Sequence, residues 1–120
     1  MKILAIGAHP DDIEVGCSGT LAKYAQAGHE VYLLVMTEGH MGGKRAVRKK
    51  EQMKSAKILK PRALMWGGCE DTSLSLHMNK MVQDIEDVLK KVTPDFIFVQ
   101  YDDDTHQDHR SLAKATISAT

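Results

Sequence analysis

The first twelve residues, MKILAIGAHPDD (1–12), contain the pattern that decides the fold. Residues 2–6 (KILAI) are a short apolar run, which is typical of a parallel strand buried on both faces. The polar residues 7–12 predict a loop at the carboxyl end of that strand. A helix is then expected from about residue 15 to residue 27, where Gly28 supplies a stop signal. The chain therefore opens with a strand–loop–helix unit.

The same unit recurs along the rest of the chain. Further strands are predicted at residues 30–36 (EVYLLVM), 63–66 and 95–100 (DFIFVQ), and helices at residues 44–59, 78–92 and from 110 onward. This alternation favours an α/β, Rossmann-like three-layer sandwich, in which a mostly parallel sheet has helices on both faces. In the common doubly wound order the strands run 3-2-1-4, and ligands bind beyond the carboxyl ends of strands 1 and 4, where the winding reverses.

Length and composition narrow the function classes. The 120 residues suit one domain, 1–120, and the chain stops inside a predicted helix, so we expect its C-terminus to be incomplete. Sixteen basic and sixteen acidic residues cancel, which leaves no global charge to attract nucleic acid or an anionic membrane. No transmembrane segment and no signal peptide is visible, so we expect a cytoplasmic protein with a small-molecule partner. Whether the protein forms a homo-oligomer stays an open question.

The loop after the first strand has the composition of a partial metal site. It places His9, Asp11 and Asp12 within four residues, and Pro10 between them restricts the backbone. The alternative is that the two acids only cap the following helix, as acids near a helix N-terminus often do. This loop by itself does not decide between the two interpretations.

The loop after the fourth predicted strand, residues 101–109, has a similar composition. His106, Asp108 and His109 fall within four residues, and they suit a metal site or a proton-transfer site. The alternative is a solvated acidic loop in which Asp108 caps the next helix. Because strands 1 and 4 are predicted neighbours, we expect this loop to meet the first one.

Taken together, the two loops predict one metal centre. His9, Asp12 and His109 would come within reach of one ion, as two imidazoles and one carboxylate with coordination positions left open. This donor set suits catalytic Zn²⁺, which lowers the pKa of a bound water to about 7. The same donors serve non-haem Fe(II) enzymes, so the donor set alone leaves the metal open.

The other polar groups of the two loops are candidates for catalytic roles. Asp11 is next to a ligand but is not needed as one, so it is a candidate general base. His106 is a candidate for stabilising an oxyanion when it is protonated. Asp108 is a candidate for holding His106 in that form by a hydrogen bond. Together these groups suit the hydrolysis of an amide or an ester.

Three motifs, AHPDD (8–12), GCSGT (16–20) and HQDH (106–109), resemble those of the LmbE-like (PIG-L) deacetylase family. The resemblance covers all 120 residues and implies the N-terminal half of a zinc-dependent N-deacetylase. Such enzymes remove the acetyl group from N-acetylglucosamine-type substrates. The resemblance implies the following roles: His9, Asp12 and His109 as zinc ligands, Asp11 as the base that activates a zinc-bound water, and His106 with Asp108 as the pair that assists the oxyanion or leaving group.

Two weaker features come from the same resemblance. The family often carries an arginine and a glutamate on its second helix, where Arg48 and Glu51 fall. Arg48 is a candidate for binding the sugar or an anionic group attached to it, and the alternative is a solvated face of a basic helix. Asp71 is a candidate acceptor for sugar hydroxyls. Ile13 stands where many members have glutamate, and Glu14 is next to it.

Two other functions stay open at the level of sequence. Members of the family are longer, and their second half completes the sheet and shapes the substrate pocket. A non-catalytic metal-binding remnant or binding module of the same fold is therefore the second hypothesis. An enzyme that uses Fe(II) in the same three-residue site is the third.

Overall fold

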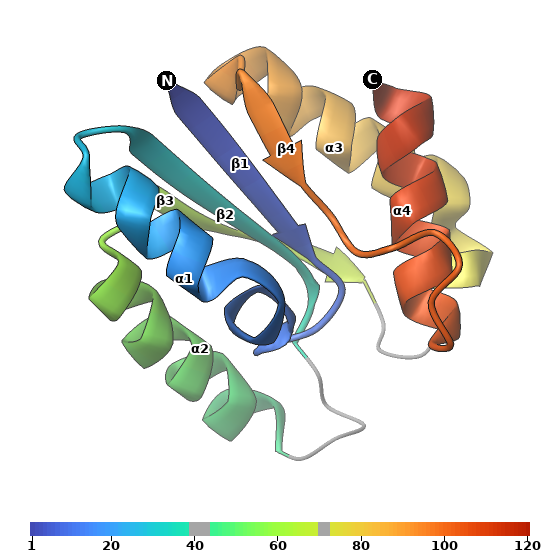
Figure 1. Ribbon diagram of the computed structural model, residues 1–120. Coiled ribbons are helices and arrows are strands. Elements are labelled where there is room, and N and C mark those ends of the chain that lie inside the picture. The colour runs from blue at the N-terminus through green and yellow to red at the C-terminus, as the bar shows by residue number, and fades with distance from the viewer. Residues whose placement is uncertain (39–43, 70–72) are drawn as a thin grey trace.

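The computed structural model describes residues 1–38, 44–69 and 73–120 (Figure 1). In these residues strands and helices alternate along the chain. Their order is β1 (Lys2–Gly7), α1 (Asp12–Gln26), β2 (Glu30–Thr37), α2 (Arg45–Leu59), β3 (Ala63–Cys69), the short 3₁₀ helix η2 (Leu74–His77), α3 (Met78–Val92), β4 (Phe96–Phe98) and α4 (Gln107–Ala119). The alternation predicted from the sequence is confirmed.

The sheet has the predicted topology. Its four strands lie in the order β3-β2-β1-β4, and every neighbouring pair is parallel. In β1, Ile3 pairs with Val31 of β2 on one side and with Phe96 of β4 on the other. Because β1 and β4 are parallel neighbours, the segments that follow them leave the sheet at the same edge.

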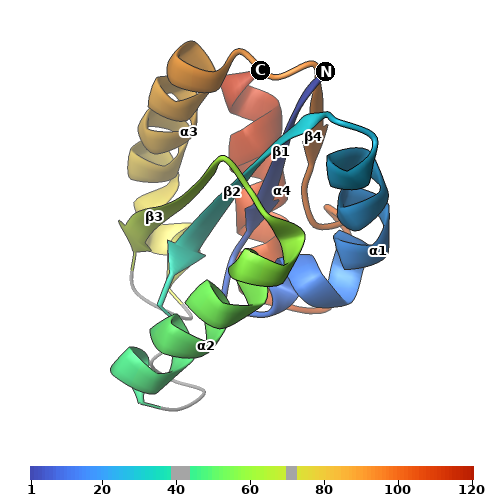
Figure 2. The same ribbon diagram turned by 90° about the vertical axis from the view of Figure 1, so that its left-hand side faces the viewer.

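Two helical layers cover the sheet. Helices α1 and α2 lie on one face, and α3 and α4 lie on the other (Figures 1 and 2). Successive residues of β1 point to opposite faces, so Ile3 packs toward α1 and α2 while Leu4 packs toward α3 and α4. Both side chains are fully buried. Burial on both faces explains why β1 reads as a continuous apolar run.

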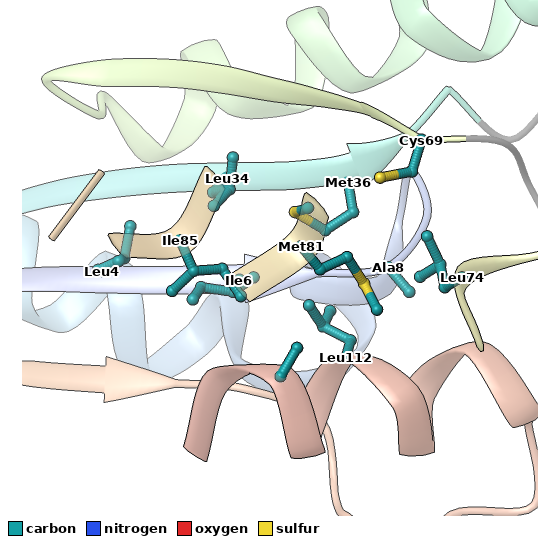
Figure 3. Close-up of a cluster of buried hydrophobic side chains, with 11 residues drawn as sticks. Leu4, Ile6, Ala8, Leu34, Met36, Cys69, Leu74, Met81, Ile85 and Leu112 are labelled. Carbon is teal, nitrogen blue, oxygen red and sulfur yellow. The ribbon is translucent and has the colours of Figure 1, made fainter. Parts of the chain in front are cut away.

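The core under α3 and α4 ties those helices to the centre of the sheet. Figure 3 shows Leu4 and Ile6 of β1 together with Met81 and Ile85 of α3 and Leu112 of α4. Each of these side chains is at most 2% exposed. Since α4 begins at the candidate site and packs through Leu112, this core fixes where the start of α4 lies.

Several predicted boundaries are wrong. Helix α1 begins at Asp12 rather than near residue 15, and β3 continues to Cys69 rather than ending at residue 66. Strand β4 keeps only Phe96–Phe98 of the predicted residues 95–100, because it is paired with β1 over three residues. Helix α4 begins at Gln107, so its first turn includes the part of the motif that was predicted as loop.

The helices are short. Helices α1, α2 and α3 contain 15 residues each, and α4 contains 13. Among the described residues, none forms a helix with both the length and the apolar character needed to cross a bilayer.

Candidate metal centre

Residues from the two ends of the chain meet at the β1–β4 edge. His9 and Asp12 follow β1, and His109 lies in the first turn of α4. One donor atom from each of these three side chains lies within 4.8 Å of the other two. His109 and Asp12 are 97 residues apart in sequence, yet His109 Nε2 lies 3.1 Å from Asp12 Oδ2. The fold therefore brings together the three predicted ligands.

Asp12 Oδ2 is the centre of the cluster. It accepts a hydrogen bond from the His9 backbone N–H at 2.7 Å and lies 3.1 Å from His9 Nδ1 and from His109 Nε2. Burial raises the pKa of the Asp12 carboxyl, but the hydrogen bonds and charge of His9 and the Gln100 amide outweigh it. The pKa of Asp12 therefore lies below its ordinary value, which keeps the carboxylate ionised and able to bind a cation.

His9 uses both ring nitrogens. Its Nδ1 faces Asp12, and its Nε2 lies 2.8 Å from Asp108 Oδ2. Asp108 is fully buried, and its Oδ1 accepts the Leu74 N–H at 3.2 Å, which fixes the carboxylate in place. A carboxylate that holds one nitrogen of a histidine orients the other nitrogen toward a metal. Nδ1 is therefore the His9 nitrogen placed to share an ion with Asp12.

The Asp108 carboxylate contacts a histidine other than the one expected. The sequence suggested that its carboxylate holds His106, and the structure places that carboxylate against His9. His9, His106 and Asp108 do form a second group whose donor atoms lie within 4.8 Å of one another. The Asp108 carboxylate is therefore bonded to His9 and lies near His106.

His106 is the N-cap of α4. Its ring Nδ1 accepts the Asp108 backbone N–H at 3.1 Å, so the interpretation of Asp108 itself as the cap is wrong. A ring that accepts at Nδ1 carries its proton at Nε2 when it is neutral. The His106 ring lies 4.7 Å from the ring centroids of both His9 and His109. The His106 ring therefore packs against the rings of both candidate histidine ligands.

Asp11 differs from Asp12 in backbone and exposure. It has φ 78° and ψ −17°, which is the left-handed region, and its side chain makes no capping hydrogen bond to α1. The Asp11 side chain is 56% exposed, whereas that of Asp12 is 19% exposed. The capping interpretation therefore does not describe Asp11. Its carboxylate stays open to solvent next to the candidate ligand Asp12.

Arg48 of α2 contacts the same loop. Its Nη2 donates to the Pro10 carbonyl oxygen at 3.2 Å and lies 4.0 Å from Asp11 Oδ2. The Arg48 side chain is 22% exposed, and its buried Nε has no hydrogen-bond partner among the residues that the structure describes. The interpretation of Arg48 as part of a solvated helix face is therefore wrong. Glu51, on the same helix, is exposed.

Two further predictions concern positions around the loop. Asp71 lies outside the described residues, so its predicted role stays a prediction. Ile13, where the resemblance suggested glutamate, is 3% exposed and packs in the core beneath α1 and α2. Glu14 instead points to α2, where its Oε1 accepts from Gln52 Nε2 at 3.1 Å.

The sequence did not single out two polar residues of this site. Asp104 Oδ1 accepts the His106 N–H at 2.8 Å and lies 3.3 Å from His109 Nδ1. The bond from the His106 backbone is the main reason why the pKa of Asp104 is lowered. Gln100 Oε1 accepts the Ala8 N–H at 3.2 Å. An acid two residues before His106 is the signal of an Asx turn and could have identified Asp104, whereas Gln100 carried no such signal.

A cavity borders the cluster on the α1 side of the sheet. Its volume is about 320 Å³, and Asp12, Cys17, Tyr101 and Asp104 are among the residues that line it. Asp12 and Asp104 line this cavity, so the cluster borders open space on the side of these two carboxylates.

Comparisons with known proteins agree with the fold and the motifs. The family model PIG-L, described as GlcNAc-PI de-N-acetylase, matches residues 4–120. YaiS, an uncharacterized deacetylase of Escherichia coli (strain K12), is 37% identical over 98% of this chain and 66% of its own length. The diacetylchitobiose deacetylase of Thermococcus kodakarensis is 32% identical over 98% of this chain and 48% of its own length.

A solved structure gives the same result in three dimensions. The N,N'-diacetylchitobiose deacetylase from Pyrococcus horikoshii superposes on this chain with a TM-score of 0.91 and 32% identity. The match covers 98% of this chain and 48% of that one, so the chain spans about half the length of this deacetylase. With the family match over residues 4–120, the chain belongs to the PIG-L (LmbE-like) deacetylase family.

Proposed function

We propose that this protein is a metal-dependent hydrolase that removes the acetyl group from an N-acetylglucosamine-type substrate. The observation that carries the proposal is the convergence of His9, Asp12 and His109 at the β1–β4 edge in a member of a deacetylase family. Two of the relatives are named for deacetylation of diacetylchitobiose, which supports an N-acetylated amino sugar as the substrate class.

The donor set fits a zinc ion. Two imidazole nitrogens and one carboxylate oxygen, with further positions open, is the composition of catalytic zinc sites, and the oriented His9 Nδ1 and the ionised Asp12 favour a cation. When bound, Zn²⁺ would supply Lewis acidity for the acetyl carbonyl and lower the pKa of water. Fe²⁺ accepts the same donors and is the alternative metal.

Asp11, His106 and Asp108 then take different roles in amide hydrolysis. We assign Asp11 as the general base, whose exposed carboxylate accepts a proton from the attacking water and returns it to the amine nitrogen as the C–N bond breaks and acetate leaves. His106 carries its proton at Nε2 and donates a hydrogen bond to the oxyanion that forms at the former carbonyl oxygen. Asp108 orients His9 through the contact between their side chains, and we assign it to His106 as well because that ring lies nearby.

Substrate binding belongs to residues around this centre. Arg48 lies next to Asp11, and we assign it to binding of the sugar or of an anionic group attached to it. Asp71 is proposed to accept hydrogen bonds from sugar hydroxyls. The cytoplasmic location stays a prediction, and so does the formation of a homo-oligomer.

The experiment is metal analysis combined with acetate release from N,N'-diacetylchitobiose by the protein in its natural length. We expect about one zinc per chain and turnover that a chelator abolishes and added Zn²⁺ restores. Bound zinc without acetate release from N-acetylglucosaminides would instead support the non-catalytic metal-binding module. Anaerobic reconstitution with Zn²⁺ or Fe²⁺ in parallel decides between the two metals.

A further inference from the structure

A buried glutamine of α2 contacts the loop that carries the proposed base. Gln52 is 0% exposed, although it lies on a helix that is otherwise rich in charged residues. Polar side chains are buried at this level only when their hydrogen bonds are satisfied. The hydrogen-bond partners of Gln52 therefore indicate why this side chain is buried.

Both ends of the Gln52 amide are used. Its Oε1 accepts the Asp11 backbone N–H at 3.0 Å, and its Nε2 donates to Glu14 Oε1 at 3.1 Å. A backbone N–H requires an acceptor and a carboxylate requires a donor, so these two partners fix the orientation of the amide. Gln52 thus links the Asp11 peptide to the first turn of α1.

The Asp11 backbone needs such support. Its φ of 78° lies in the left-handed region, which non-glycine residues disfavour. Gln52 holds the Asp11 N–H, and Val15 N–H donates to the Asp11 carbonyl oxygen at 2.9 Å. Arg48, one helical turn before Gln52, holds the preceding Pro10 carbonyl. Strained residues persist where the surroundings fix them, and this happens often at active sites.

We propose that Gln52 is a positioning residue for the deacetylation. It holds Asp11 in the left-handed conformation, and it thereby fixes the direction in which the Asp11 carboxylate leaves the backbone next to the ligand Asp12. This inference rests on the proposed function, because it takes Asp11 as the base. The two hydrogen bonds of Gln52 go to the Asp11 backbone and to Glu14 rather than to the three proposed ligands, so we expect its removal to affect the base and to leave the metal in place.

The test begins with Gln52→Met, which keeps the side-chain length and removes both hydrogen bonds. In the zinc-loaded protein of natural length, kcat for acetate release from N,N'-diacetylchitobiose is expected to fall about ten- to a hundredfold, as small displacements of catalytic groups do. KM and zinc content are expected to stay unchanged. The Asp11 amide is expected to exchange with solvent faster, which NMR measures directly.

A double variant separates positioning from packing. In Gln52→Glu with Glu14→Gln, the new carboxylate accepts from the Asp11 N–H and from the new amide at position 14. Both hydrogen bonds return, the first with its direction unchanged and the second with donor and acceptor exchanged. We expect kcat and the protection of the Asp11 amide to recover. The matched control is Gln83→Met on α3, which removes a surface hydrogen bond to Asp87 and should leave kcat unchanged.

The outcomes separate the inference from the proposed function. Wild-type kcat or unchanged Asp11 amide exchange in Gln52→Met overturns the role of Gln52, and so does a folded double variant that stays as slow as Gln52→Met. A wild-type protein that binds zinc but releases no acetate contradicts the proposed function. In that case the exchange rate of the Asp11 amide in Gln52→Met still tests whether Gln52 holds the Asp11 backbone. If Gln52→Met does not fold, Gln52→Asn, which is one methylene too short to reach both partners, replaces it under the same criteria.

Discussion

At the scale of single residues, Asp11 and Asp12 show how one step along the backbone separates two roles. Asp12 begins α1, and its Oδ2 is surrounded by one N–H and two imidazole nitrogens. Asp11 is left-handed, and its carboxylate is mostly exposed. A surrounded carboxylate suits a cation, whereas an exposed one can exchange protons with water.

The first prediction concerns Asp11→Asn. Asparagine tolerates the left-handed region, so the loop and its ligands should keep their places, while the side chain can no longer accept the proton. We expect zinc content to stay at the wild-type level and kcat for acetate release to fall at least ~10²-fold, the scale of general base catalysis. Full turnover in this variant, measured beside a metal determination, would remove Asp11 from the mechanism.

The second prediction concerns Asp12 in the metal-free protein. Its pKa lies below the ordinary 3.8 in the folded state, so the unfolded chain takes up this proton more readily. The stability that Asp12 contributes is therefore fully present above pH 3.8 and is lost as the pH falls through the folded-state pKa. Urea unfolding with a chelator present should show a free-energy difference between wild type and Asp12→Asn at neutral pH that shrinks in acid. An equal difference at both pH values would contradict this linkage.

At the scale of elements, the start of α4 combines structural and chemical tasks. His106 caps the helix through Nδ1, Asp108 reaches back to His9, and His109 faces Asp12. Asp104 holds the turn that leads into the helix through the His106 N–H. These bonds place three groups of the site on one rigid helical turn, and Leu112 anchors that helix in the core.

The third prediction separates the cap from the chemistry at His106. In His106→Ala the cap is lost, which should lower the free energy of unfolding by about 1 kcal/mol. In His106→Asn the side chain can still accept from the helix N-terminus, so stability should stay close to wild type. Acetate release should fall in both variants, because neither has the Nε2–H. If His106→Asn kept wild-type turnover, His106 would serve only as a cap.

At the scale of the whole molecule, the site depends on the sheet order. The pairing of Ile3 with Phe96 places β4 next to β1, although more than ninety residues separate them. The cluster therefore forms only when both ends of the domain have folded together. A metal bound there would link the two ends.

The fourth prediction follows from this linkage. An ion that binds the folded chain and not the unfolded chain stabilises the fold, by about 2.7 kcal/mol when its concentration is a hundred times its Kd. Zn²⁺ should therefore raise the Tm of the wild-type protein. Thermal unfolding of His109→Ala, with and without Zn²⁺, should show little or no rise. An equal rise in both proteins would place the zinc elsewhere.

Local pattern was enough to predict most of the fold. The apolar run at residues 2–6, buried on both faces, marked the central strand, and the alternation of strand and helix segments predicted the parallel sheet. Boundaries were less predictable, as at β4, because strand length depends on how far a partner strand runs alongside. The motif residues of the two loops were also visible, because histidines and acids gather there over a few residues.

The sequence by itself determined the element types, the strand order expected of alternating units, and the identity of the three candidate ligands. Only the tertiary structure decided that Asp108 lies against His9 and that Gln52 supports Asp11. Each of these contacts depends on the exact position of side chains brought together by packing, and both join segments far apart in the chain. Periodicity and local motifs do not predict such distances, because the packing of the helices on the sheet determines them.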